Sequence, residues 1–193
     1  MSRKEMPRVY ELRDLIDDPS KPSAYFQNFD SLLRDEPSKK LTWLAREREF
    51  QRLDAESWQR LKDEALPFLT AHNAKGRGWE QLISILNQAR AHNYLVDHGC
   101  SQVRFIPRSQ KQGQKTPDLG AELNGQKVLC EVKTINISEA EAHKRQTGVA
   151  GSTSNFLDEA FFKKLESTLH EAKCQIDAYD GRVEARCVRS RQL

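Results

Sequence analysis

The spacing of hydrophobic positions predicts several helices along the chain. Tyr25 to Arg34 and Leu41 to Arg52 have helical patterns, and Asp54 is placed to cap a further helix. That further helix carries Trp58, Leu61 and Ala65 on one stripe. Residues 1–75 are therefore expected to form a helical accessory segment, ending in the plausible hinge His72 to Gly78.

The pattern changes after this hinge. Residues 79–97 have helical spacing and are followed by Gly99 as a stop. Gln102 to Ile106, Leu119 to Leu123 and Gln126 to Ile135 are typical of strands, and Asn124-Gly125 indicates a tight hairpin between the last two. A long helix is expected over Phe156 to Asp180, with its apolar face formed by Leu157, Phe161, Leu165, Leu169, Ala172 and Ile176.

This order predicts an α/β fold in which helices pack on a small sheet, with residues 76–193 as one domain. Val183 to Val188 could begin one more strand before the sequence GRVEARCVRSRQL ends. A domain shortened at its C-terminus, a weak edge strand and completion of the sheet by a homodimer are all open.

Composition names no partner by itself, since the 193 residues carry a formal net charge of only +3. Charge is more informative locally, because the stretch from Ser101 to Thr116 contains no acidic residue. Its four basic residues are Arg104, Arg108, Lys111 and Lys115. They could contact nucleic-acid phosphates, or simply form a solvated loop.

The remaining bulk features exclude several classes of protein. The four cysteines form no Cys-x-x-Cys pair, and the histidines lack the spacing of a zinc enzyme. No run approaches membrane-spanning length, and the start lacks an apolar signal region. We therefore expect a reduced, cytoplasmic protein with no membrane partner.

The predicted hairpin carries the candidate chemistry. Asp118 stands thirteen residues before Glu131, and Lys133 follows two residues later. Alternation would turn Glu131 and Lys133 away from a core made by Val128, Cys130 and Val132. Asp118 and Glu131 would then converge at the open end of the hairpin, as Mg²⁺ or Mn²⁺ requires, and Lys133 could hold the attacking water. The alternative is an exposed Glu-x-Lys pair on a solvated strand.

Pro117-Asp118 followed by Glu131-Val132-Lys133 resembles the PD-(D/E)XK nuclease superfamily. The resemblance covers roughly residues 76–188. It implies a restriction-endonuclease-like core, in which a small mixed β-sheet is flanked by helices. It also implies Mg²⁺-dependent phosphodiester hydrolysis, with Asp118 and Glu131 as metal ligands and Lys133 as the catalytic lysine.

Three further positions fit this resemblance. Glu80 stands where many members carry a glutamate on the helix before the sheet. Gln175 and Tyr179 are four apart on the later helix, which is similar to the RecB-like branch. Glu80 could equally be an ordinary first-turn glutamate, while Tyr179 could pack in the core and Gln175 could be solvated.

We therefore predict a metal-dependent nuclease that hydrolyses DNA. RNA as substrate, and endo- or exonuclease action, are left open. The alternative is a non-catalytic nucleic-acid-binding or adaptor module on the same fold, motivated by the polar composition and the helices of the first third.

Overall fold

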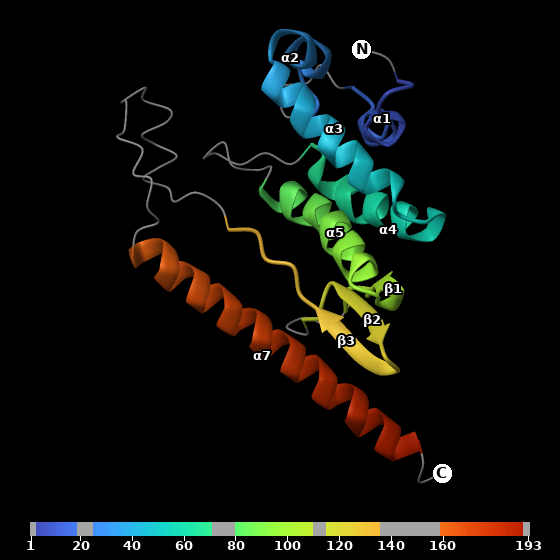
Figure 1. The fold of residues 1–193 in the computed structure, drawn as a ribbon, viewed down its shortest axis with the longest axis vertical. Coiled ribbons are helices and arrows are strands. Elements are labelled where there is room, and N and C mark those ends of the chain that lie inside the picture. Colours follow the sequence, from blue (N-terminus) through green and yellow to red (C-terminus); the bar gives the residue numbers. More distant parts are fainter. Residues whose placement is uncertain (1–2, 19–24, 71–79, 110–114, 136–158, 191–193) are drawn as a thin grey trace. The chain divides into compact units, whose positions relative to one another are not determined.

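The computed structural model describes residues 3–18, 25–70, 80–109, 115–135 and 159–190. Over these residues the chain is a mixed α/β structure with six α-helices and one three-stranded antiparallel sheet (Figure 1). It forms two compact units that interleave along the sequence. The first unit is Met1–Pro107 with Asp118–Cys130, and the second is Arg108–Pro117 with Glu131–Leu193. These units do not divide at residue 75, and the expected functional boundary there stays a prediction.

The first unit contains most of the regular structure. Its helices are α1 (Pro7–Asp14), α2 (Phe29–Asp35), α3 (Pro37–Gln51), α4 (Ala55–Ala65), the 3-10 helix η1 (Leu66–Phe68) and α5 (Glu80–Asp97). Its strands are β1 (Ser101–Phe105), β2 (Leu119–Leu123) and β3 (Gln126–Cys130). The second unit contains α7 (Glu159–Ser190).

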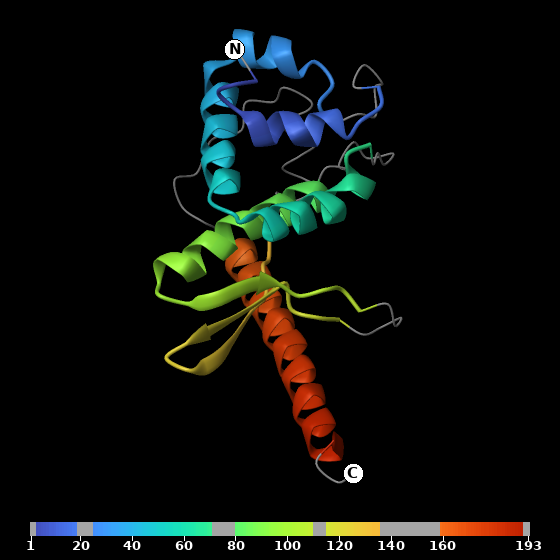
Figure 2. The same cartoon turned by 90° about the vertical axis from the view of Figure 1, so that its right-hand side faces the viewer.

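Local sequence explains where the helices of the first unit begin. α1 and α3 each start with a proline in the first turn, where the missing N–H costs nothing. The Asp54 side chain accepts a hydrogen bond from the Ser57 backbone N–H at 2.8 Å and caps α4, as predicted. In Figure 2, α1 and α2 both pack against α3.

Helices α1 and α3 cap one another. Glu47 on α3 is only 2 % exposed, and its carboxylate accepts from the first-turn N–H groups of α1, at 3.3 Å from Arg8 and 2.9 Å from Val9. In return, the Arg8 guanidinium donates to the carbonyls of Phe50 and Leu53 at the end of α3. Each helix therefore satisfies the backbone groups that the other leaves unpaired.

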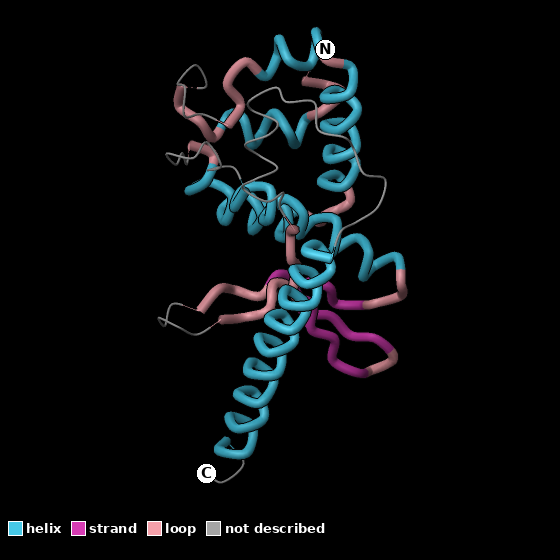
Figure 3. Tube along the Cα trace, turned by 90° about the vertical axis from the view of Figure 1, so that its left-hand side faces the viewer, coloured by secondary structure: helices cyan, strands magenta, loops and turns pink. Residues whose placement is uncertain are grey.

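The sheet packs against α5, and all three strands lie in one antiparallel sheet of order β1-β2-β3 (magenta in Figure 3). The hairpin turn has φ of +52° at Asn124 and +77° at Gly125, as a two-residue turn of this kind requires. Glu122 pairs with Lys127 in the resulting register, which confirms the predicted hairpin. α5 ends at Asp97, and Gly99 follows two residues later with φ of +80°, which confirms the predicted glycine stop.

Three expectations about strands were wrong. The second hairpin strand was expected to reach Ile135 but ends at Cys130, because its partner β2 begins at Leu119 and the ladder stops at that pair. Residues 183–188 were expected to begin a strand but continue α7, since their Glu, Ala and Arg residues are good helix formers. The described strands are antiparallel throughout rather than mixed, because β1, β2 and β3 are neighbours in sequence order.

Candidate functional site

Asp118 is fixed by two contacts within the first unit. Its backbone carbonyl accepts from the Ile106 N–H at 2.9 Å, which continues the ladder between β1 and β2 beyond the strand ends. Its carboxylate oxygen Oδ1 accepts from the Gln88 amide Nε2 at 2.8 Å. Gln88 is 4 % exposed, so its amide is held in place by the packing of α5. The Asp118 carboxylate therefore has a defined orientation before any ligand binds.

Gln88 was missed by the sequence analysis. It lies on the buried face of α5, three residues after Ile85 and four before His92. A polar side chain on the apolar stripe of a helix needs a hydrogen-bond partner, and this position was the available signal. Because Gln88 bonds to Asp118, it belongs to the candidate site.

Glu131, Lys133 and Gln175 meet within the second unit. The Glu131 side chain is 6 % exposed, and its Oε1 lies 2.9 Å from the Lys133 ammonium nitrogen. Its other oxygen, Oε2, accepts from Gln175 Nε2 at 2.7 Å. The same Gln175 amide also donates to the Thr116 carbonyl at 2.7 Å. One amide on α7 thus contacts both the residue before the Pro-Asp pair and the glutamate of the Glu-x-Lys motif.

Glu131 and Lys133 lie together, but not for the reason that the sequence suggested. Strand alternation was expected to bring Glu131 and Lys133 to one face, but both residues follow the end of β3. An ion pair brings them together instead, and the contact to α7 buries the carboxylate. The exposed, solvated Glu-x-Lys pair that was the alternative is therefore wrong for Glu131.

The other accessory positions stay predictions. Tyr179 lies one turn beyond Gln175 on α7 and is half-buried. Glu80 is the first residue of α5 and is eight residues before Gln88, or about 12 Å along the helix axis at 1.5 Å per residue. The contact from α5 to Asp118 therefore comes from Gln88.

The basic residues that were predicted to contact phosphates do not all belong to the same unit. Arg104 is exposed on β1 and lines a groove of about 710 Å³ in the first unit. The groove also contains the acidic residues Asp54, Glu56 and Asp63. Arg108 and Lys115 are exposed members of the second unit, and Lys111 lies outside the described residues. Phosphate binding by these four residues stays a prediction.

The carboxylates of Asp118 and Glu131 each offer oxygen ligands of the kind that a hard cation prefers. Each Glu131 oxygen accepts one hydrogen bond, from the Lys133 ammonium or the Gln175 amide, and each keeps a further lone pair that a metal ion can use. Within the described residues, no group of three or more His, Cys, Asp or Glu side chains is arranged to hold a metal ion. A hydrated Mg²⁺ can be bound through one or two carboxylates, with waters as its other ligands.

No family model, curated protein or solved structure matches this chain. Among the described helices, none combines the length and apolar character needed to cross a membrane.

Proposed function

We propose that this protein is a metal-dependent nuclease that hydrolyses phosphodiester bonds in DNA. The observation that carries the proposal is the Glu131–Lys133–Gln175 cluster. Glu131 is a nearly buried carboxylate, and burying a charge is costly unless the group is paired and hydrogen-bonded. Here the buried carboxylate is paired with a lysine two residues later. This is the pair of residues that the PD-(D/E)XK resemblance associates with catalysis.

Asp118 and Glu131 would hold the ion. When bound, Mg²⁺ or Mn²⁺ would lower the pKa of a coordinated water and stabilise charge on the phosphodiester. The resemblance of Pro117-Asp118 and Glu131-Val132-Lys133 to the PD-(D/E)XK motif supports the same assignment.

The chain's own residues have distinct tasks in this proposal. Lys133 donates a hydrogen bond to Glu131 in the free protein. When substrate binds, the same ammonium group can instead donate to a phosphate oxygen or to the attacking water. Gln175 fixes the Glu131 carboxylate from the opposite oxygen and keeps it oriented during that exchange. Gln88 does the same for Asp118.

The test is cleavage of labelled linear and circular DNA with Mg²⁺, with Mn²⁺ and with EDTA. Glu131→Gln and Lys133→Ala should each abolish metal-dependent cutting. Glu122→Gln is the matched control, since Glu122 is a carboxylate on β2 near the turn of the same hairpin. Its carboxylate accepts from the Gln102 amide at 3.0 Å and is outside the Glu131–Lys133–Gln175 cluster. Equal cleavage by wild type and Glu131→Gln would end the nuclease proposal.

One observation favours a second function, a non-catalytic nucleic-acid-binding module. Both Glu131 oxygens are engaged by donors of the chain itself, which makes the cluster self-sufficient without a metal. This alternative predicts DNA binding that is equal in Mg²⁺ and EDTA and unchanged in Glu131→Gln, with no cutting under any condition. Metal-dependent cutting would exclude it.

A further inference from the structure

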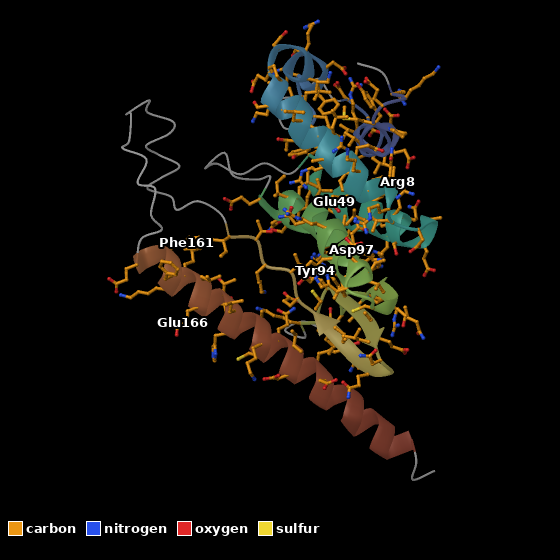
Figure 4. The ribbon with its side chains drawn as sticks, in the orientation of Figure 1. Arg8, Glu49, Tyr94, Asp97, Phe161 and Glu166 are labelled. Atoms are coloured by element: carbon orange, nitrogen blue, oxygen red, sulfur yellow. The ribbon has the colours of Figure 1, made fainter. Side chains whose placement is uncertain are left out.

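Polar side chains connect α3 and α5 along one seam of the first unit. The Arg52 guanidinium after α3 is bonded to the Asp97 carboxylate at the end of α5. One turn earlier, the Asn93 amide donates to Glu49, at 2.9 Å to its carbonyl and 2.7 Å to its carboxylate. Figure 4 labels Glu49 and Asp97 on these two helices. Residue numbers rise together along both helices, so the helices run in the same direction.

One helical turn before the contact between Glu49 and Asn93, each helix carries an arginine. Three residues before Glu49 is Arg46, and three residues before Asn93 is Arg90. The pKa of Arg46 is lowered mainly by burial, and the nearby positive charge of Arg90 lowers it further.

Within the described residues, neither arginine side chain is paired. Over the residues that the structure describes, no hydrogen bond or ion pair involves the Arg46 or Arg90 side chain. The acidic residues beside Arg46 on α3 are committed elsewhere, since Glu47 caps α1 and Glu49 is bonded to Asn93. Arg46 is half-buried and Arg90 is exposed, so an anion from solution can reach the pair.

The positive charges of Arg46 and Arg90 disfavour one another, and burial of Arg46 increases the cost of its charge. An oxyanion that bridges them removes both penalties. Guanidinium forks match the geometry of phosphate oxygens, and arginine is favoured over lysine for such contacts. The seam therefore offers a built anion site rather than a scattered set of surface cations.

We propose that Arg46 and Arg90 form a phosphate-binding site on the seam between α3 and α5, and that a nucleic-acid backbone phosphate occupies it. The site itself follows from the two unpaired arginines. Its assignment to a nucleic-acid backbone rests on the proposed function. Free inorganic phosphate has the same chemistry, so the experiment has one arm for each source.

The first arm measures thermal unfolding in inorganic phosphate and in sodium chloride at equal ionic strength. Wild type should gain about 3 °C or more once phosphate exceeds its dissociation constant roughly tenfold. Arg46→Gln and Arg90→Gln should each lose this gain. Arg48→Gln is the matched control, because Arg48 is exposed on α3 and lies on a different face from Arg46. An equal gain in all four proteins, or no gain in wild type, would overturn the site.

The second arm measures binding of labelled duplex DNA by anisotropy in EDTA, over a range of salt concentrations. Arg46→Gln and Arg90→Gln should bind more weakly, with a salt-dependence slope reduced by about 1 relative to wild type. Arg48→Gln should resemble wild type. Phosphate stabilisation combined with unchanged DNA affinity would overturn the nucleic-acid assignment.

The two proposals can fail separately. Glu131→Gln tests cleavage and leaves the seam untouched. Absence of cutting by wild type, together with an arginine-dependent response to phosphate and DNA, would refute the nuclease and support the phosphate site.

Discussion

Replacement of Glu47 should destabilise the protein more than replacement of any exposed residue of α3. Its carboxylate is 2 % exposed and accepts three hydrogen bonds, from the N–H groups of Arg8 and Val9 and from the Gln51 amide at 2.8 Å. Hydrogen bonds to a charged group contribute about 1.5–3 kcal/mol each, and the longest of these, at 3.3 Å, counts for less. Glu47→Ala should therefore lower the free energy of unfolding by about 3–5 kcal/mol.

Glu47→Gln refines this estimate. The amide keeps one acceptor oxygen for the Val9 N–H, but its NH₂ group cannot accept from Arg8 or Gln51. We expect a loss of about 1–2 kcal/mol, intermediate between wild type and Glu47→Ala. Arg48→Ala is the control on the same helix and should change the free energy of unfolding by less than about 0.5 kcal/mol.

Urea unfolding followed by tryptophan fluorescence is a suitable assay, because Trp58 lies 5.2 Å from Phe50 at the end of α3, between ring centroids. With a slope of about 2 kcal/mol/M, Glu47→Ala should lower the urea midpoint by roughly 1.5–2.5 M. Arg8→Ala combined with Glu47→Ala should cost less than the sum of the single changes, since either change alone undocks α1. A loss below about 1 kcal/mol for Glu47→Ala would refute mutual capping as a source of stability.

Three further outcomes are expected. His92 is 5 % exposed, neither ring nitrogen has a hydrogen-bond partner in the described part of the chain, and burial lowers its pKa. Below about pH 6.5 this histidine takes up a proton in the unfolded chain but not in the folded protein. The free energy of unfolding therefore falls by up to about 1.4 kcal/mol per pH unit. His92→Phe should remove this pH dependence, measured by urea titrations at pH 7.5 and 5.5. The backbone N–H of Ser57 lowers the pKa of Asp54. The stabilising effect of the ionised Asp54 carboxylate is therefore present above about pH 3.9 and is lost as the pH falls further. In urea unfolding, Asp54→Ala should lower the free energy of unfolding by about 1 kcal/mol at pH 7 but by much less at pH 3. Gln88→Leu should reduce metal-dependent cleavage about tenfold or more while the urea midpoint stays near that of wild type, and full activity in this variant would count against a role in orienting Asp118.

Local signals predicted the parts of the fold that depend on neighbouring residues. The Asn124-Gly125 turn, the Asp54 cap and the Gly99 stop each act within a few residues, and each is found where the sequence indicated. The end of β3 was wrong because it depends on where the partner strand begins, which the apolar run through Ile135 does not reveal. Residues 183–188 were ambiguous because alternation and helical propensity pointed in different directions.

Longer-range contacts account for what the site analysis missed. Glu131 and Lys133 were predicted to share one face of a strand, and Gln175 was named as an accessory, although its bond to Glu131 spans 44 positions in sequence. Gln88 gave only a weak signal, because its bond to Asp118 spans 30 positions. The joint metal site, the catalytic role of Lys133 and the phosphate contacts by Arg104, Arg108, Lys111 and Lys115 stay predictions.

The interleaving of the two units limits how the protein can be cut into parts. A fragment ending at Cys130 would retain every segment of the first unit, whereas a fragment beginning at Glu131 would lack the segment Arg108–Pro117 of the second. Such a fragment would lose Thr116, and the Gln175 amide would lose one of its two acceptors. If the chain is expressed as two halves divided after Cys130, the first half must supply the loop between β1 and β2 to complete the second unit. A single continuous fragment that contains the whole second unit must also include β2 and β3.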